Sequence, residues 1–310
     1  MDVLVSWPFH VPGRLLFLPY QIMLAVTNTT TINQVMSVYK SRLFSMFSAP
    51  AFSRKTAVLW LCFLLPWSGL ALAKPQVMII IDDVGYRHSD LATLTLPTQV
   101  TLSILPDTPL GGTIADRASR QGRDVMLHLP MESENGNKLG PRALTVGMYP
   151  HTIADTLSDA LRTVPNAMGI NNHMGSLLTR ERLPMQALMQ AVKKEGLFFI
   201  DSKTTPDSVA ADIARKTGIP TAVRDVFLDH VHTREFLEQQ MTELVGIAKK
   251  RGVAIGIAHP HPLSVAFLAE VLPELEKQGI TLISANDYFS SPASPSSVKP
   301  AKRRVILAPQ

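Results

Sequence analysis

The sequence has very little cysteine. Its 310 residues include one, Cys62, which lies in an apolar stretch near the N-terminus. If that stretch is removed, the remaining chain has no thiol, which excludes disulfide bonds, thiolate metal ligands and a cysteine nucleophile. A chain without thiols also suits an oxidising compartment.

The central part of the chain lacks the basic surface of a nucleic-acid-binding protein. The net charge of +5 comes from the two ends, because residues 1–73 carry a net +4 and residues 291–310 another +4. Residues 74–290 are therefore acidic, with a net charge of −3. A nucleic-acid-binding domain needs a basic patch or stripe, so we expect no nucleic-acid partner.

The N-terminal region contains the parts of a secretory signal. Residues 58–73 read VLWLCFLLPWSGLALA, follow two basic residues and end in a small-x-small sequence. We expect residues 46–73 to be a signal peptide that is cleaved after Ala73, which places the mature protein in the periplasm. An uncleaved membrane anchor is the alternative. It is disfavoured because Pro66 interrupts the stretch and spanning needs about 20 apolar residues.

The two ends of the chain do not match any folded element. Residues 1–45 have no clear hydrophobic period and no helix caps, so we expect an over-long extension with the true start at Met46 or Met36. A membrane-associated segment is the alternative. Residues 291–310 are rich in Pro, Ser and Lys, which is typical of a disordered tail.

Residues 74–290 alternate between strand-like and helix-like patterns. The expected strands are 77–81, 100–105, 125–129, 168–172, 197–200, 222–228, 253–258 and 280–284. The expected helices include 152–164, 183–195, 207–216, 233–250 and 263–278. Most of the strand-like runs are apolar throughout, as in parallel strands buried on both faces. Seven to eight such strands in one α/β domain favour a (β/α) barrel, and no Gly-rich phosphate loop supports the alternative of an open nucleotide-binding sheet.

Polar residues gather at the C-terminal ends of these strands. They are Asp82 and Asp83, His128 with Glu132 beyond it, Asn171, Asn172 and His173, Asp201 and Ser202, Arg224, Asp225 and Asp229, and His259. In a (β/α) barrel these ends open on one face, where active sites lie. Each residue alone could be a helix cap or a buried polar group, but together they predict a site. Carboxylate and imidazole groups are ligands for zinc or a similar divalent ion.

The adjacent residues Asp82 and Asp83 raise a geometric question. Neighbouring residues in a strand point to opposite sides, so both can serve one site only if the backbone turns there. Gly85 permits such a turn.

Six segments carry a resemblance to a known family. They are IDDVG (81–85), HLPME (128–132), GINNHMGS (169–176), FFIDSKT (198–204), RDVFLD (224–229) and GIAHPHP (256–262). This set resembles the signature motifs of the divergent polysaccharide deacetylases. The resemblance implies a distorted (β/α) barrel, a divalent metal, which we expect to be zinc, and removal of N- or O-acetyl groups from a polysaccharide.

The resemblance also implies roles for individual residues. Asp82 corresponds to the catalytic base, Asp83 to the carboxylate ligand and His259 to the general acid. Typical members carry two histidine ligands in an H-[ST]-x-x-H motif, which this chain lacks. His128 and His173, on neighbouring strands, are the nearest candidates to replace that pair as ligands.

The remaining rim residues are assigned to the substrate. We expect substrate contacts from Glu132, Asn172, Asp201, Arg224 and Asp225. For Glu132, a role as fourth ligand or as a cap stays open. Two main functions stay open as well, with a different hydrolase at the same metal site as a third. One is a metal-dependent deacetylase acting on a cell-envelope glycan, and the other is a non-catalytic glycan-binding or regulatory barrel. The sequence names no protein partner, and a membrane is expected only through an uncleaved signal.

Overall fold

A computed structural model describes residues 74–291 of the chain. The predicted N-terminal extension (1–45), the predicted signal peptide (46–73) and residues 292–310 of the predicted tail lie outside the described residues. The strands are β1 (Gln76–Val84), β2 (Thr101–Ile104), β3 (Val125–Met131), β4 (Gly169–Met174), β5 (Phe198–Asp201), β6 (Thr221–Val223), β7 (Val226–Phe227), β8 (Val253–Ala258) and β9 (Thr281–Ile283). The helices are η3 (His88–Thr95), α3 (Gly111–Arg120), α4 (Pro150–Thr163), η4 (Leu178–Arg180), α5 (Arg182–Glu195), α6 (Ala210–Thr217), α7 (Arg234–Arg251), α8 (Pro262–Lys277) and α9 (Ala285–Ser290).

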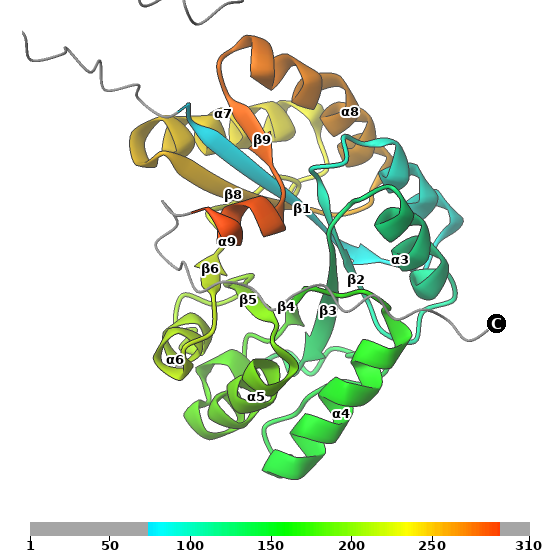
Figure 1. Cartoon of the computed structure of the whole chain (residues 1–310), viewed down its shortest axis with the longest axis vertical. Helices are drawn as coiled ribbons and strands as arrows, with labels where there is room; N and C mark the ends of the chain where they lie inside the picture. Colours follow the sequence, from blue (N-terminus) through cyan, green and yellow to red (C-terminus); the bar gives the residue numbers. More distant parts are fainter. Residues whose placement is uncertain (1–73, 292–310) are drawn as a thin grey trace, which may run out of the picture. The chain divides into compact units, whose positions relative to one another are not determined.

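The strands form one parallel sheet surrounded by helices (Figure 1). Its order is β6-β5-β4-β3-β2-β1-β8-β7, and β9 pairs with the start of β1. Every strand pair is parallel. The predicted distorted (β/α) barrel is confirmed. Within residues 74–291, no helix is both long enough and apolar enough to cross a membrane.

The distortion of the barrel lies in the predicted strand 222–228, which is divided into β6 and β7. The Arg224 N–H donates to the carbonyl of Asp201 at the end of β5, at 3.0 Å. The next N–H, of Asp225, donates to the carbonyl of Ile255 in β8, at 2.9 Å. The chain therefore passes from one edge of the sheet to the other, and these two residues join the edges.

Alternate residues of each strand pack into two separate hydrophobic clusters. In β1, Val77, Ile79 and Ile81 belong to a large cluster that includes the buried residues of the surrounding helices. Met78 and Ile80 belong to a smaller cluster built from strand residues and α9. The first cluster is the outer face of the sheet and the second is the barrel interior. The outer face is apolar because the surrounding helices cover it, and the inner face is apolar because the strands and α9 pack against one another there.

Helix α9 fills the interior at the N-terminal end of the strands. Phe289 stacks on Phe198 with ring centroids 4.5 Å apart. The Ala285 N–H donates to Thr101 Oγ1 at 3.2 Å, at the start of β2. The apolar filling therefore lies on the side opposite the strand ends that carry the polar residues.

Candidate metal centre

The inner face of the barrel changes from apolar to polar at the C-terminal ends of the strands. In β1, Asp82 follows Met78 and Ile80 on this face, and in β3 His128 follows Met126. Asp82 and His128 are both 2% exposed. Strand periodicity alone therefore directs a carboxylate and an imidazole toward the same space.

Asp83 reaches the same space because the backbone turns at this residue. Its φ is 58°, in the left-handed region that Asp tolerates better than most residues. The pairing of β1 with β2 shifts register between Ile81 and Val84. Gly85 follows with φ of 132°, and a Cβ there would lie 2.2 Å from Thr108 Oγ1, so only glycine fits. The predicted turn is present, and it begins at Asp83 itself.

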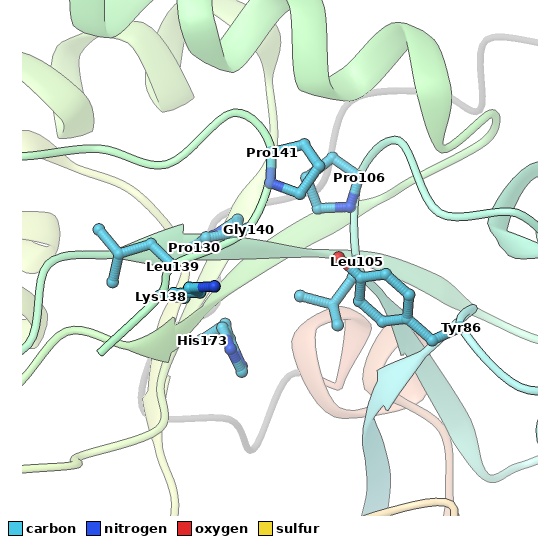
Figure 2. A pocket seen from close by; sticks show the side chains of 9 residues that line it. All are labelled: Tyr86, Leu105, Pro106, Pro130, Lys138, Leu139, Gly140, Pro141 and His173. Atoms are coloured by element: carbon cyan, nitrogen blue, oxygen red, sulfur yellow. The ribbon is translucent and has the colours of Figure 1, made fainter.

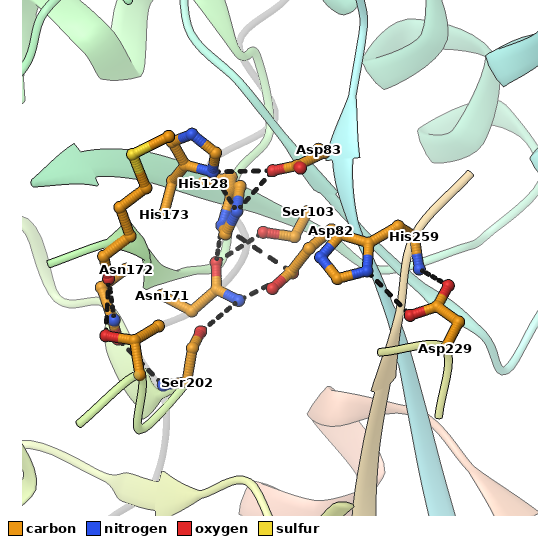
Figure 3. Close-up of polar contacts among 12 residues, drawn as sticks. Asp82, Asp83, Ser103, His128, Asn171, Asn172, His173, Ser202, Asp229 and His259 are labelled. Atoms are coloured by element: carbon orange, nitrogen blue, oxygen red, sulfur yellow. Dashed lines mark hydrogen bonds and ion pairs between the residues drawn. The ribbon is translucent and has the colours of Figure 1, made fainter. Parts of the chain in front are cut away.

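Asp83, His128 and His173 form a compact cluster (Figure 3). Asp83 Oδ1 lies 2.7 Å from His173 Nδ1 and 3.0 Å from His128 Nε2. The two ring nitrogens are 3.2 Å apart. Ligand atoms about 2.0–2.2 Å from one tetrahedral ion would be ~3.3–3.6 Å apart. The three side chains therefore converge almost as the ligands of one ion would.

The hydrogen bonds around His128 show that the cluster fits a cation. His128 Nδ1 lies 2.8 Å from Asn171 Oδ1, which also accepts a hydrogen bond from Ser103 Oγ at 2.6 Å. Because Nδ1 faces an oxygen acceptor, it carries the hydrogen of a neutral ring and Nε2 carries the lone pair. That lone pair faces Asp83 Oδ1, a buried oxygen without a hydrogen bond of acceptable geometry. Two acceptors at this distance need a cation between them, either a metal ion or a proton.

Electrostatics in the cluster follow from the same contacts. Burial alone would raise the pKa of the Asp83 carboxyl, but His128 and His173 outweigh burial and hold the pKa well below its ordinary range. Burial would lower the pKa of His128, but the charges of Asp82 and Asp83 raise it. The cluster thus favours a carboxylate that is ionised and surrounded by positive charge.

Asp82 lies beside this cluster without being one of the three converging groups. Its Oδ1 accepts a hydrogen bond from Asn171 Nδ2 at 2.8 Å and lies 3.8 Å from His128 Nδ1. Burial raises the pKa of Asp82, and the nearby His128 and His259 rings and the Asn171 amide counteract part of that effect. A buried carboxylate next to three converging ligand atoms is placed to exchange a proton with a group held there.

His259 follows β8 and is held by Asp229, which lies two residues after β7. His259 Nδ1 is 2.8 Å from Asp229 Oδ1, and the His259 N–H donates to Asp229 Oδ2 at 2.7 Å. Burial would lower the pKa of His259, but the bond to Asp229 and the charges of Asp229, Asp83 and Asp82 raise it to about 9. Figure 3 shows the ring between Asp229 and Asp82. The ring is a proton donor directed toward the cluster.

His261 makes a second group of possible ligands with Asp229 and His259. The Asp229 oxygens already accept hydrogen bonds from the His259 ring, the His259 N–H and Ser264 Oγ, the last at 2.8 Å. Hydrogen bonds therefore account for the positions of Asp229 and His259 without an ion.

Three of the residues predicted to contact the substrate form hydrogen bonds to other residues of the barrel. Asn172 and Asp201 alternate with inner-face residues and so lie on the outer face. Asn172 bonds to the Met174 carbonyl and the Ser202 N–H, and Asp201 accepts from Lys203 N–H and Ser208 Oγ. Asp225 accepts a hydrogen bond from the Ile255 N–H. Ile255 pairs with Met78, four residues before Asp82 in β1, so this bond lies away from the strand ends that carry the cluster. These bonds do not test a substrate contact, which stays a prediction for all three residues.

Glu132 and Arg224 are also held by the backbone. Glu132 Oε2 accepts a hydrogen bond from the Val146 N–H at 2.7 Å, which fixes the long segment between β3 and α4. Arg224 donates to the carbonyls of Ser202 and Lys203, at 2.7 and 2.9 Å, and lies over the Phe227 ring. A substrate contact by either residue stays a prediction.

A pocket adjoins the cluster, and the His173 ring forms part of its wall (Figure 2). It is lined by Tyr86, Leu105, Pro106, Pro130, Lys138, Leu139, Gly140, Pro141 and His173. Three prolines and two leucines make the wall rigid and apolar, while Lys138 and Tyr86 supply polar atoms. A small group could therefore lie here next to the cluster, between an apolar wall and the exposed Tyr86 and Lys138 side chains.

The sequence places Asn171, Ser202 and Asp229 among the polar residues at the strand ends without a specific role for any of them, and it does not single out Ser103. Asn171 Nδ2 also donates to Ser202 Oγ at 3.2 Å, so one amide contacts four groups. The alternation of faces could have identified Asn171, because Ile170 packs on the outer face. The pairing of Asp229 with His259 had no sequence signal, because 30 positions separate them.

Fold and site together define a parallel (β/α) barrel with a carboxylate–imidazole cluster at the C-terminal ends of its strands. The chain belongs to the divergent polysaccharide deacetylase family, whose model matches residues 79–289. This confirms the resemblance seen in the sequence motifs.

Two relatives and one solved structure are similar to the chain. It is 35% identical over 246 residues to the uncharacterized protein YibQ of Escherichia coli (strain K12), covering 78% of this chain and 76% of YibQ. It is 34% identical over 210 residues to an uncharacterized protein of Haemophilus influenzae, covering 67% and 75%. The crystal structure of an uncharacterized protein from Agrobacterium tumefaciens C58 has a TM-score of 0.66 at 27% identity, covering 71% of this chain and 90% of that one.

Proposed function

We propose that this protein is a metal-dependent hydrolase that removes acetyl groups from a glycan of the cell envelope. The observation that carries the proposal is the arrangement around the cluster of Asp83, His128 and His173. A buried carboxylate, Asp82, lies on one side of it and an Asp-held imidazole, His259, on the other. Family membership supports the choice of an acetylated glycan as substrate.

The three converging side chains would hold the ion. Two imidazoles and one carboxylate are a ligand set of catalytic zinc, which leaves a position for water or substrate. A divalent ion bound there would lower the pKa of its water and polarise the acyl carbonyl. His128 would contribute Nε2 and His173 would contribute Nδ1, the nitrogens that face Asp83.

The other side chains would move the protons. Asp82 accepts a proton from the water that attacks the carbonyl carbon, while Asn171 holds the other carboxylate oxygen. His259, protonated and held through Nδ1 by Asp229, gives a proton from Nε2 to the departing nitrogen or oxygen. The bond from the carbonyl carbon to the sugar nitrogen or oxygen breaks, and acetate leaves. The proton lost from water is thereby balanced by the proton gained by the sugar.

The cellular location follows from the N-terminal sequence. Residues 46–73 have the three parts of a signal peptide, and the chain after them has no cysteine. Both features support export to the periplasm, where envelope glycans would be accessible. The glycan itself is the proposed partner of the site.

Acetate release tests the function. The purified protein would be stripped with a chelator, reloaded with zinc, cobalt or nickel, and assayed on N-acetylated chitin oligomers, acetylated xylan oligomers and peptidoglycan fragments. Metal-dependent release that is lost in Asp82→Asn is expected. If no substrate yields acetate, and glycan binding is the same in wild type and Asp82→Asn, the protein is a glycan-binding barrel. The missing H-[ST]-x-x-H motif is the feature that favours this second function.

A further inference from the structure

We infer that Asn171 is a positioning residue that aligns the base Asp82 and the ligand His128 through opposite ends of one side-chain amide. The roles of Asp82 and His128 rest on the proposed function. The geometry of the amide does not, because it is given by contacts that hold whatever the site does.

The Asn171 side chain is fully buried and uses all of its hydrogen-bonding capacity. Its Oδ1 accepts from Ser103 Oγ at 2.6 Å and lies 2.8 Å from His128 Nδ1. Its Nδ2 donates to Asp82 Oδ1 at 2.8 Å and to Ser202 Oγ at 3.2 Å. An amide offers two lone pairs and two hydrogens, so each of the four has a partner on a different strand or strand end.

This set of partners fixes the direction of the amide. If the group were rotated by half a turn, its oxygen would face the Asp82 carboxylate, and two acceptors would meet in a buried space. An unpaired buried acceptor destabilises the fold, and more so when it is charged. The amide therefore has one stable orientation, with the NH₂ group toward Asp82.

The fixed amide has two consequences. It requires His128 Nδ1 to carry a hydrogen, which leaves Nε2 with its lone pair toward Asp83 and His173. It also holds Oδ1 of Asp82, which leaves Oδ2 for a reacting water. A hydrogen bond to the other ring nitrogen of a metal-binding histidine usually orients that ring and tunes the affinity for the metal. Here the same side chain also orients the base.

Two substitutions at Asn171 distinguish the acceptor role of its amide from the donor role. Asn171→Leu has a similar size but removes both the acceptor for His128 and the donor for Asp82. Asn171→Asp keeps an acceptor for His128 and removes the donor. Asn172→Leu is the matched control, because Asn172 is equally buried and hydrogen-bonded but faces the outer side.

Zinc affinity, measured by competition with a chromophoric chelator, is the main readout. Asn171→Leu is expected to bind zinc about 10–100-fold more weakly than wild type. Asn171→Asp and Asn172→Leu should bind it as tightly as wild type or more tightly. A purely structural role for Asn171 would give a different order, because a new buried charge destabilises more than a leucine. Asn171→Asp would then be the more damaged variant.

Acetate release adds a second readout. Both Asn171 variants should lose kcat with little change in KM, because Asp82 loses its fixed position in each. If wild type binds zinc but releases no acetate, the proposed function fails while zinc affinity still tests the link from Asn171 to His128. If Asn171→Leu does not fold, Ser103→Ala removes one donor from the same amide and should weaken zinc binding several-fold. Wild-type zinc affinity in Asn171→Leu, or in a folded Ser103→Ala if Asn171→Leu does not fold, would overturn the inference.

Discussion

The carboxylate of Asp229 holds both the ring and the backbone of His259. Its Oδ1 lies 2.8 Å from His259 Nδ1, and its Oδ2 accepts from the His259 N–H at 2.7 Å. Ser264 Oγ donates to the same Oδ2 at 2.8 Å. With Nδ1 engaged in this way, Nε2 is the nitrogen left to donate a proton. The direction and the charge of His259 therefore depend on one buried carboxylate.

The first prediction concerns pH. Burial opposes protonation of His259, but Asp229, Asp83 and Asp82 raise its pKa from 6.5 to about 9. The His261 ring lies next to the His259 ring. Burial and the neighbouring His232 lower the pKa of His261. A general acid must be protonated to act. The activity of the enzyme is therefore fully present below the pKa of His259 in the folded protein and is lost as the pH rises through that pKa. We expect kcat/KM for acetate release to fall as the pH rises through the pKa of His259, which lies above the ordinary value of 6.5.

Asp229→Asn tests the cause of this fall in activity at high pH, the basic limb of the pH profile. Without the carboxylate, the pKa of His259 should return toward its ordinary value of 6.5, so the basic limb moves to lower pH. Asp225→Asn is the control, because Asp225 bonds to the Ile255 N–H and not to His259. A basic limb that stays in place in Asp229→Asn would mean that His259 is not the titrating group.

The second prediction separates proton transfer from metal binding. Asp82→Asn and His259→Ala remove a proposed base and a proposed acid but none of the three converging ligand atoms. Each should lose on the order of 10²–10⁴-fold in turnover, the usual range for general acid–base catalysis. Their zinc content, measured on the purified proteins by mass spectrometry of the metal, should equal that of wild type. Loss of zinc in His259→Ala would place His259 among the ligands instead.

Much of the fold was predictable because the strands are apolar on both faces. The eight apolar runs correspond to the strands, with 222–228 divided into β6 and β7. That division could not be predicted, because it depends on Arg224 and Asp225 pairing with strands far away in sequence. Local pattern carries no information about which edge a backbone N–H will reach.

Alternation explains which of the predicted site residues face the barrel interior. Asn171 and Asn172 are the same residue type in one strand, yet Ile170 packs outward, so Asn171 faces the interior and Asn172 does not. Asp201 follows the inner residue Ile200 and therefore points outward. This alternation of inward and outward side chains can be read from the sequence. Applied to every strand, it would have selected Asn171 over Asn172. The contact between Asp229 and His259 depends on the register of two strands and needed the structure.

The third prediction concerns the stability of the barrel. Arg123 is 1% exposed and lies just before β3. Its guanidinium donates to the carbonyls of Leu94, Leu96, Pro97 and Val100. Arg123→Met would leave several buried carbonyls without donors, so the free energy of unfolding should fall by about 3 kcal/mol. Urea denaturation measures this change. Arg120→Met, at an exposed position of α3, should change stability by less than about 0.5 kcal/mol.

The fourth prediction concerns export. N-terminal sequencing of the periplasmic protein should return Lys74, Pro75 and Gln76, because cleavage is expected after Ala73. Deletion of residues 1–45 should leave export intact, since this segment supplies none of the parts of the signal. A protein that keeps Met46 and stays in the membrane fraction would contradict cleavage.

The last prediction separates the two properties of Asp83, its charge and its backbone. Asn also tolerates a φ near 58°, so Asp83→Asn should keep the turn and the stability of the metal-free protein while zinc affinity falls sharply. Asp83→Val removes the ligand as well but places a β-branched residue in the left-handed region, which costs about 1–3 kcal/mol. Urea denaturation without metal should therefore separate the two variants, and zinc competition should not. Zinc binding by Asp83→Asn at the wild-type affinity would show that Asp83 does not contact the ion, and the site would then have to be rebuilt around His128 and His173.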